Sequence, residues 1–344
     1  MIEIEKSSLD EFAGMCAKER WDSIAKPLGS LGLLEDAIIK LAKIQHTENV
    51  RIDKRRVIVM CSDNGVVSEG VTQSESSVTA LCADEIADGR SNVNAIADTV
   101  CADVLAVDIG VAANTKALDK KIAEGTKNIA EGAAMTREEA TRAIMTGIEL
   151  VRDSEIDGVN IIVTGEMGIG NTTTSAAIAS VLLGLSPCDV TGRGAGLDDE
   201  RLAHKIEVIG RAIEVNAPEP DDALDVLSKL GGLDIAGMAG LFIGGAEYGI
   251  PVIIDGAISA VAALIAERLV PGCSEYILAS HVSAEPVGKL LLEALGLKPV
   301  ITAEMRLGEG TGGLMLLPLL DCALSVYNSA HRFEEIDLER YRPL

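Results

Sequence analysis

The chain has 344 residues, 48% of them hydrophobic, and its mean hydropathy is +0.27. A chain of this length and composition buries a large core, which excludes an intrinsically disordered protein. Lysine and arginine total 30 against 53 acidic residues, so the net charge is -23 at pH 7. Because this charge repels polyanions, we predict a small-molecule ligand and no nucleic-acid partner.

The seven cysteines are scattered, with no Cys-x-x-Cys pair, and stand apart from the four histidines. This spacing favours reduced thiols over a disulfide framework or a zinc site. The chain shows no charged-then-apolar leader, and no uninterrupted apolar run reaches about 18 residues. We therefore expect a cytoplasmic protein with no membrane partner.

The first 50 residues have a helical pattern. Ile38, Leu41 and Ile44 recur at steps of three, which places them on one face of a helix. Before them, the proline and two glycines of segment 26–32 predict a turn, with a helix starting near Leu33. We read residues 1–50 as a small helical piece.

From residue 56 onward, short apolar runs alternate with helical patterns. The predicted strands are 57–61, 104–107, 161–164, 251–254, 276–279 and, with the weakest signal, 300–302. The predicted helices between and after them are 137–153, 172–183, 198–215, 235–248, 257–268 and 313–328. Continuous apolar runs are typical of strands covered on both faces. The alternation therefore predicts an α/β fold with a mainly parallel sheet and flanking helices.

The predicted strands end in glycines accompanied by carboxylates or amides, and ligands of parallel sheets bind beyond these strand ends. One such loop, 165–174, contains Glu166 and Asn171 and leads into a helix. Its glycines expose backbone N–H groups where a helix begins, which favours a phosphate, although the loop is neither a Walker nor a Rossmann motif. The alternative is a tight turn capped by Asn171.

A second glycine-rich loop covers residues 191–199, with Arg193 inside it and Lys205 in the helix that follows. Two loops of main-chain donors with one or two cations would hold a phosphomonoester. The alternative is equally open at this point, because Asp198 alone makes an ordinary N-cap for the helix.

The third loop places Glu309 between Gly308 and Gly310. A ligand can approach this carboxylate because glycines do not crowd it, and closure of the pocket would raise its proton affinity, as suits a general base. A solvated loop glutamate is the alternative. Asp255 and His281, at other strand ends, are as compatible with structural roles as with ligand contact. We find no metal-ligand cluster and no catalytic triad, and we predict neither a metal nor a cofactor.

Several segments in one order resemble nicotinate-nucleotide:dimethylbenzimidazole phosphoribosyltransferase. These segments are 26–35, 63–72, 165–173, 192–197, 231–240, 255–256, 280–285 and 306–312. The resemblance runs from about residue 20 to the C-terminus. It implies a Rossmann-like six-stranded sheet in residues 51–328, a small helical domain in which residues 1–50 are joined by about 329–344, and a homodimer.

The resemblance also implies roles for individual residues. Glu309 matches the family's catalytic base, and Glu166 matches a second carboxylate of the active site. The residues expected around the ribose phosphate are Gly165, Gly168, Asn171, Gly192, Gly194, Gly196 and Lys205, with Ser280 and Ser283 near the nucleotide. The acceptor base is expected to contact Ser74, Cys82 and Leu307.

The implied reaction transfers the 5-phosphoribosyl group from nicotinate mononucleotide to 5,6-dimethylbenzimidazole, with inversion at C1′. Leu28, Asn64, Glu75 and Cys82 depart from the family pattern, and the changes near the acceptor leave other benzimidazoles, adenine or phenolic bases open. Two further alternatives are a phosphoribosyltransferase or nucleosidase with another acceptor, including water, and a non-catalytic nucleotide-binding sensor.

Overall fold

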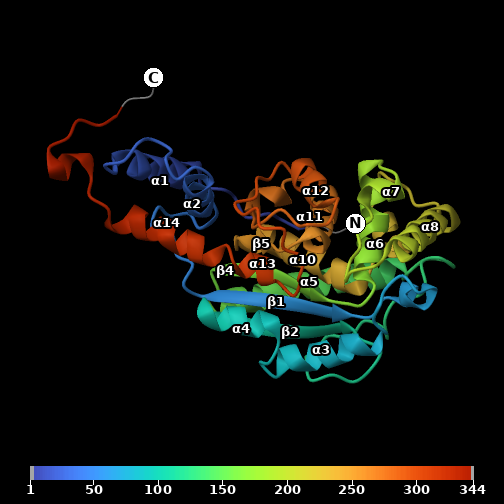
Figure 1. Ribbon diagram of the computed structural model, residues 1–344. Helices are drawn as coiled ribbons and strands as arrows, with labels where there is room; N and C mark the ends of the chain where they lie inside the picture. The colour runs from blue at the N-terminus through green and yellow to red at the C-terminus, as the bar shows by residue number, and fades with distance from the viewer. Residues whose placement is uncertain (1–3, 342–344) are drawn as a thin grey trace.

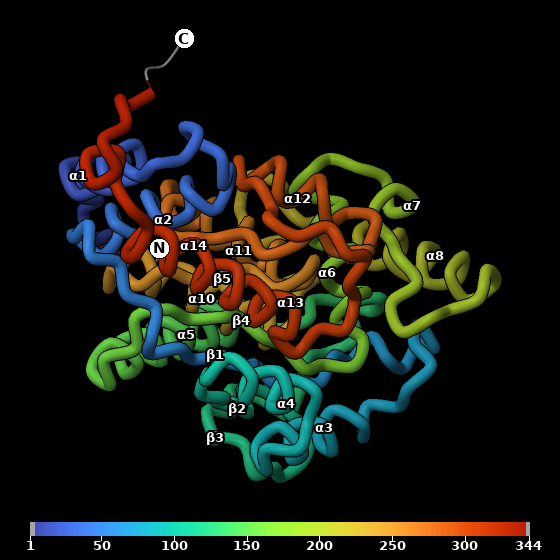
Figure 2. Tube along the Cα trace, turned by 60° about the vertical axis from the view of Figure 1, so that its left-hand side comes forward, coloured from blue at the N-terminus to red at the C-terminus, as the bar shows by residue number. Residues whose placement is uncertain are grey.

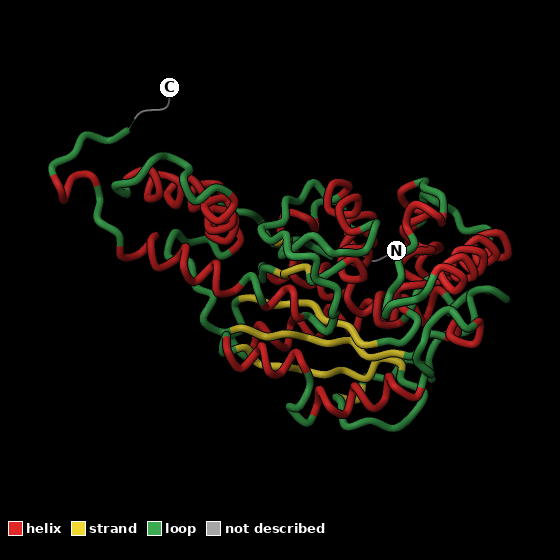
Figure 3. The backbone as a smooth tube through the Cα atoms, in the orientation of Figure 1, coloured by secondary structure: helices red, strands yellow, loops and turns green. Residues whose placement is uncertain are grey.

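The computed structural model describes residues 4–341, and its main sheet has six parallel strands. The strands are β1 (Arg55–Ser62), β2 (Ala102–Gly110), β3 (Leu118–Asp119), β4 (Ile161–Met167), β5 (Val252–Ile254) and β6 (Ile277–Ala279). Their order across the sheet is β3-β2-β1-β4-β5-β6. Figure 3 shows helices on both sides of the strands. The predicted α/β fold with a parallel sheet is confirmed.

One strand prediction is wrong. Residues 300–302 form only an isolated bridge between Ile301 and His281, and the backbone N–H groups of Val300 and Ile301 both donate to the carbonyl of Ser280. The sixth strand is instead β3, which pairs with β2 at the opposite edge. Both of its residues are exposed, so it leaves no apolar run in the sequence.

The helices follow the predicted alternation closely. They are α1 (Glu11–Ser23), α2 (Leu33–Ile44), α3 (Ser77–Ala87), α4 (Asn92–Thr99), α5 (Arg137–Ile156), α6 (Asn171–Leu183), α7 (Pro187–Val190), α8 (Asp199–Asn216), α9 (Ala223–Leu230), α10 (Leu233–Tyr248), α11 (Ala257–Leu269), α12 (Gly288–Ala294), α13 (Thr311–Leu314) and α14 (Leu317–Ser329). The single helix predicted over 313–328 is two helices, because Pro318 lacks the N–H that a continuous helix requires and stands in the first turn of α14.

The two faces of the sheet contribute to two separate hydrophobic cores. Along β1, Ile58 and Met60 point into a core shared with α5, α6, α10 and α11. Val57 and Val59 point the other way, into a core shared with α3, α4 and α14. Since side chains alternate across a strand, a sheet covered on both faces needs the continuous apolar run that the sequence has here.

The terminal helices lie together on one side of the molecule, as Figures 1 and 2 show for α1, α2 and α14. The rings of Trp21 in α1 and Tyr327 in α14 are 5.0 Å apart between centroids. Lys26, in the turn before α2, and Glu35, in the first turn of α2, form a largely buried ion pair. The helical grouping thus includes α14, which begins before residue 329. The division into a helical and an α/β domain stays a prediction, because Trp21 and Ile38 share their core with the sheet.

Helices α5 and α10 approach each other through glycines. A Cβ atom at Gly240 would lie 2.0 Å from the backbone oxygen of Ile144. We expect Gly240→Ala to lower the free energy of unfolding by about 3 kcal/mol, because backbone atoms cannot move aside as a flexible side chain can. Urea denaturation followed by circular dichroism measures this.

Gly210 in α8 is the matched control, since a Cβ there meets nothing within 4 Å. Gly210→Ala is expected to raise the free energy of unfolding by about 0.5–1 kcal/mol, because alanine loses less backbone entropy in a helix. Equal effects of the two substitutions would contradict the proposed close packing of α5 and α10.

Candidate active site

A cavity of about 210 Å³ lies beyond the carboxyl ends of β4, β5 and β6. Each of these strands supplies an ionisable residue to its wall, at or just after the strand end: Glu166 from β4, Asp255 after β5 and His281 after β6. The loop that contains Gly308 covers the same space. The cavity therefore occupies the edge of the sheet at which the sequence predicted a ligand.

Glu166 is 7% exposed and hydrogen-bonds through Oε2 to the side-chain amide of Asn171. The same amide nitrogen donates to Oδ2 of Asp234, at 3.0 Å. Burial raises the pKa of Glu166 to about 8, and the charges of Asp234 and Asp255 add to the rise. Burial raises the pKa of Asp234 to about 6, so Asp234 ionises before Glu166.

The raised pKa of Glu166 makes the stability of the ligand-free protein depend on pH. From the ordinary value of 4.5 up to about 8, the folded state holds a proton on Glu166 that the unfolded state has lost, so the free energy of unfolding falls as pH rises. We expect Glu166→Gln to raise that free energy by about 1–3 kcal/mol at pH 8 and to change it little at pH 5.

Thermal or urea unfolding at the two pH values checks this expectation. Glu304→Gln provides the control, because it makes the same substitution at an exposed position. A Glu166→Gln effect of the same size at pH 5 and pH 8 would show that Glu166 is already ionised in the fold.

Lys205 lies at the other end of the site and is only 1% exposed. Its Nζ donates to Oγ1 of Thr172 at 3.0 Å and to the carbonyl of Gly192 at 3.3 Å, and it forms no ion pair with any residue of the described range 4–341. Burial lowers the pKa of Lys205 to about 8, opposed by the charge of Glu285. A buried ammonium group without a carboxylate partner is suited to bind an anion.

Gly194 connects this lysine to the cavity. A Cβ at Gly194 would lie 3.0 Å from Oγ1 of Thr172 and 3.6 Å from Nζ of Lys205, and both Gly194 and Thr172 line the cavity. The residue has a positive φ of 51°, which glycine adopts without cost. An anion in the cavity can therefore approach Lys205 over the bare backbone of this loop.

The loop around Glu309 is held by Asp255. Its Oδ1 accepts the backbone N–H groups of Gly312 at 2.7 Å and Gly313 at 3.0 Å, and its Oδ2 accepts that of Gly310 at 3.2 Å. Glu309 itself has a φ of 62°, an uncommon conformation for a residue with a side chain. Asp255 thus stabilises a strained turn that fixes the position of Glu309.

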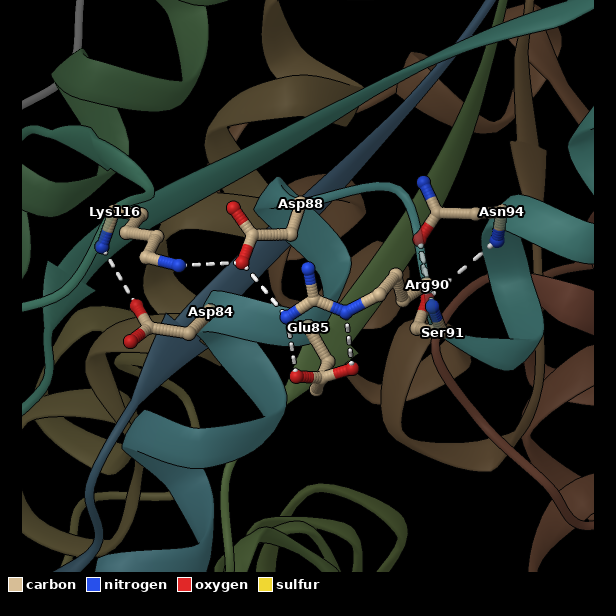
Figure 4. A network of polar contacts seen from close by, with 7 residues as sticks. All are labelled: Asp84, Glu85, Asp88, Arg90, Ser91, Asn94 and Lys116. Carbon is tan, nitrogen blue, oxygen red and sulfur yellow. Dashed lines mark hydrogen bonds and ion pairs between the residues drawn. The ribbon is translucent and has the colours of Figure 1, made fainter.

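The carboxylate of Glu309 lies against the start of α4. Its Oε2 accepts the backbone N–H of Val93 at 3.1 Å, and the side chain is 8% exposed. Ser91 and Asn94 cap this end of α4. Figure 4 shows the capping residues beside Arg90, which pairs with Glu85 and Asp88. Burial raises the pKa of the Cys82 thiol, and the charge of Glu309 raises it further. Cys82 therefore lies close to the Glu309 carboxylate.

The structure brings some of the predicted site residues to the cavity and leaves others behind it. The cavity is lined by Glu166, Gly168, Asn171, Gly194, Ser283 and Leu307. The other predicted residues, which do not line it, are Ser74, Cys82, Gly165, Gly192, Gly196, Lys205, Ser280 and Glu309.

Two residues of this second group contact residues of the lining: Lys205 donates to Thr172, and a Cβ at Gly192 would meet the side chain of Glu285. A Cβ at Gly165 would lie 2.5 Å from the backbone oxygen of Glu309, and the carbonyl of Gly196 accepts the amide of Gln73, next to Ser74. Ser280 is different, because its hydroxyl donates to the carbonyls of Ile254 and Asp255 and is fully buried. The structure therefore does not bring the Ser280 hydroxyl to the cavity.

The comparisons with known proteins agree on one family. Residues 7–337 match the family model described as phosphoribosyltransferase. The chain belongs to this family. It is 48% identical over 329 residues to the nicotinate-nucleotide--dimethylbenzimidazole phosphoribosyltransferase of Acetivibrio thermocellus, covering 95% of this chain and 94% of that protein. The protein of the same name from Ruminiclostridium cellulolyticum is 46% identical over 331 residues, with 95% and 94% covered.

Solved structures agree with the sequence relatives. CobT from Thermus thermophilus is 34% identical and superposes with a TM-score of 0.90, covering 96% of this chain and 100% of that one. The similarity to this enzyme family thus extends over nearly the whole chain. Within residues 4–341, no helix is both long and apolar enough to cross a membrane, and no group of three or more His, Cys, Asp or Glu side chains is arranged to hold a metal ion.

Two residues of the site had no role in the sequence analysis. Asp234 is fully buried beside Asn171, and Thr172 contacts Lys205. Asp234 follows Gly231 and Gly232 at the start of a helical pattern, and this position is equally typical of an ordinary acidic first turn. Only the fold shows that it faces the loop after β4.

Proposed function

We propose that this protein transfers the 5-phosphoribosyl group from nicotinate mononucleotide to 5,6-dimethylbenzimidazole or a related lower-ligand base. The products are α-ribazole 5′-phosphate and nicotinate, with inversion at C1′. The observation that carries this proposal is the buried Lys205, unpaired with any carboxylate of residues 4–341, at one end of a cavity whose other wall holds Glu166 and the Glu309 loop. Membership of the family supports it.

We assign the phosphate to the loop around Gly194 and to Lys205. The charge-assisted hydrogen bonds of a phosphate to an ammonium group and to backbone N–H groups are stronger than neutral ones. Bound phosphate would also give Lys205 a direct ion-pair partner, which it lacks among residues 4–341. Ribose and ring then extend from this end toward Glu166.

We assign the role of general base to Glu309. The nicotinate ring of the nucleotide is a cationic pyridinium, so it leaves as a neutral ring nitrogen and needs no general acid. The acceptor must lose its N–H proton while its other nitrogen attacks C1′ from the opposite face. A carboxylate held on a fixed turn, as Glu309 is, supplies one well-placed base for this proton.

Glu166 is assigned an electrostatic role at the anomeric carbon. The pyridinium ring of the nucleotide favours the ionised form of a carboxyl group beside it, so binding would lower the pKa of Glu166 from its ligand-free value of about 8. The resulting carboxylate would stabilise positive charge at C1′ as the ring departs. We further propose that Cys82 and Ser74 contact the acceptor, that the enzyme is a homodimer, and that it works in the cytoplasm.

Chromatography of products from a panel of acceptors tests the proposed function. The panel contains 5,6-dimethylbenzimidazole, benzimidazole, adenine and a phenol, each mixed with nicotinate mononucleotide and enzyme. Nicotinate release that requires a base, together with an α-riboside phosphate, supports the proposal. Release without any base would indicate a nucleosidase, and binding without release would indicate a sensor.

A further inference from the structure

Asp234 is a buried carboxylate that the proposed reaction does not use. It is 0% exposed and does not line the cavity. Its Oδ2 accepts the side-chain amide of Asn171 at 3.0 Å, and its Oδ1 accepts the backbone N–H of Ile235 at 3.0 Å. Both oxygens are thus fixed by donors that belong to different elements, α6 and α10.

The Asp234 carboxylate fits against the backbone only because residues 168 and 232 are glycines. A Cβ at Gly168 would lie 2.6 Å from Oδ2, and a Cβ at Gly232 would lie 2.2 Å from Oδ1. Gly168 follows β4, the strand that carries Glu166, and belongs to the short loop that leads into Asn171. The sequence therefore seats the Asp234 side chain directly against the loop that forms the cavity wall.

Asn171 joins Asp234 to Glu166. Its amide nitrogen has two hydrogens, and each points to one carboxyl group, Oδ2 of Asp234 and Oε2 of Glu166. Because Asp234 accepts one hydrogen, the amide cannot flip without placing its oxygen against a carboxylate. The other oxygen of Glu166 then lies at the cavity side, where a Cβ at Gly308 would be 2.5 Å from it.

We propose that Asp234 is a positioning residue of the active site, which acts through the amide of Asn171 to fix the Glu166 carboxyl group with Oε1 toward the cavity. This inference rests on the proposed function for its catalytic consequence. Asp234 is suited to carry the negative charge of the pair, because it lies in the first turn of α10, where N–H groups and the helix dipole favour an anion. Glu166 lies near the end of β4 and not at a helix N-terminus, so no helix dipole favours its anion.

The charge of Asp234 also affects when Glu166 ionises. The ionisable groups that face Glu166 are Asp234 on α10, Asp255 after β5 and the Cys61 thiol on β1. Burial keeps that thiol neutral by raising its pKa well above its usual value. Removing the Asp234 charge should lower the pKa of Glu166, whereas removing the Asn171 amide should raise it, because the amide favours the carboxylate.

The test is a pH titration of the ligand-free protein with ¹³C in its glutamate side-chain carboxyl groups. The Glu166 resonance is identified by its loss in Glu166→Gln. We expect Asp234→Asn to move the Glu166 midpoint to lower pH by about one unit, and Asn171→Ala to move it to higher pH. Asp108→Asn is the matched control. Asp108 is likewise a buried acid, 3% exposed, but it lies in β2 and its contacts are Val111, Thr115 and Lys121.

An unchanged midpoint in Asp234→Asn, or an equal change in Asp108→Asn, would overturn the proposal. If Asp234→Asn does not fold, Asn171→Ala provides the test. A Glu166 midpoint at higher pH in that variant supports the proposal, and a lower or unchanged midpoint contradicts it. In turnover, Asp234→Asn should move the ionisation seen in the profile of kcat/KM against pH to lower pH. In a protein that already carries Glu166→Gln, adding Asp234→Asn should not move that profile. The titration needs no turnover, so absence of nicotinate release by the wild type would refute the proposed function separately.

Discussion

Glu309→Gln is expected to lower the rate of phosphoribosyl transfer by about 10²–10⁴-fold, the usual contribution of a positioned general base. Glutamine keeps the shape of the side chain but cannot take the proton of the acceptor. Since we assign the phosphate to Lys205, the affinity for nicotinate mononucleotide should be retained. Steady-state kinetics of nicotinate release and calorimetric titration of the nucleotide measure the two quantities.

Glu304→Gln is the matched control for this variant. Glu304 lies on the same loop and also has a positive φ, of 51°, but it is exposed. Its replacement should leave the rate unchanged. A Glu309→Gln enzyme with wild-type turnover would remove Glu309 from the role of base, and a loss of rate shared by both variants would point to the loop as a whole.

Lys205→Met should weaken nucleotide binding by about 10–100-fold, because a hydrogen bond to a charged group contributes about 1.5–3 kcal/mol. The same change should stabilise the ligand-free protein by about 1–2 kcal/mol at pH 7. Burial lowers the pKa of Lys205 to about 8, so between that value and its ordinary 10.5 the folded state holds fewer protons than the unfolded state. The gain should therefore disappear as pH rises from 8 toward 10.5.

Lys40→Met separates the anion-binding role from general burial. Lys40 is partly buried, with its pKa also lowered to about 8, but its Nζ donates to the carbonyls of Ser274 and Ile277. Its replacement should not change the affinity for nicotinate mononucleotide. Lys205→Met with unchanged affinity would place the phosphate elsewhere in the cavity.

The parallel sheet was predictable because its central strands are continuous apolar runs buried on both faces. Val57, Ile58 and Val59 in β1 are all fully buried, so the pattern in the sequence matches the environment directly. By contrast, β3 has two exposed residues and depends on pairing with β2, which no local pattern records. The break before α14 was readable from Pro318, which the prediction passed over.

The site was predictable only in part. Glycines on both sides of Glu309 indicated an accessible carboxylate, but its contact with Val93 joins residues 216 positions apart and depends on the fold. Ser280 shows what the sequence cannot predict at a strand end. Adjacent side chains face opposite ways there, so sequence alone does not decide whether the Ser280 hydroxyl turns to the cavity or to the carbonyl of Ile254. Asp234 also needed the fold, because its contact with Asn171 joins residues 63 positions apart.

The most direct measurement is a crystal structure of the ternary complex with nicotinate mononucleotide and a benzimidazole, made with the slow Glu309→Gln variant. We predict the side chain at position 309 within hydrogen-bond distance of the acceptor's ring nitrogen, on the side away from C1′, with the phosphate on Lys205. A structure in which residue 309 stays on the N–H of Val93, and another group contacts that nitrogen, would contradict the account.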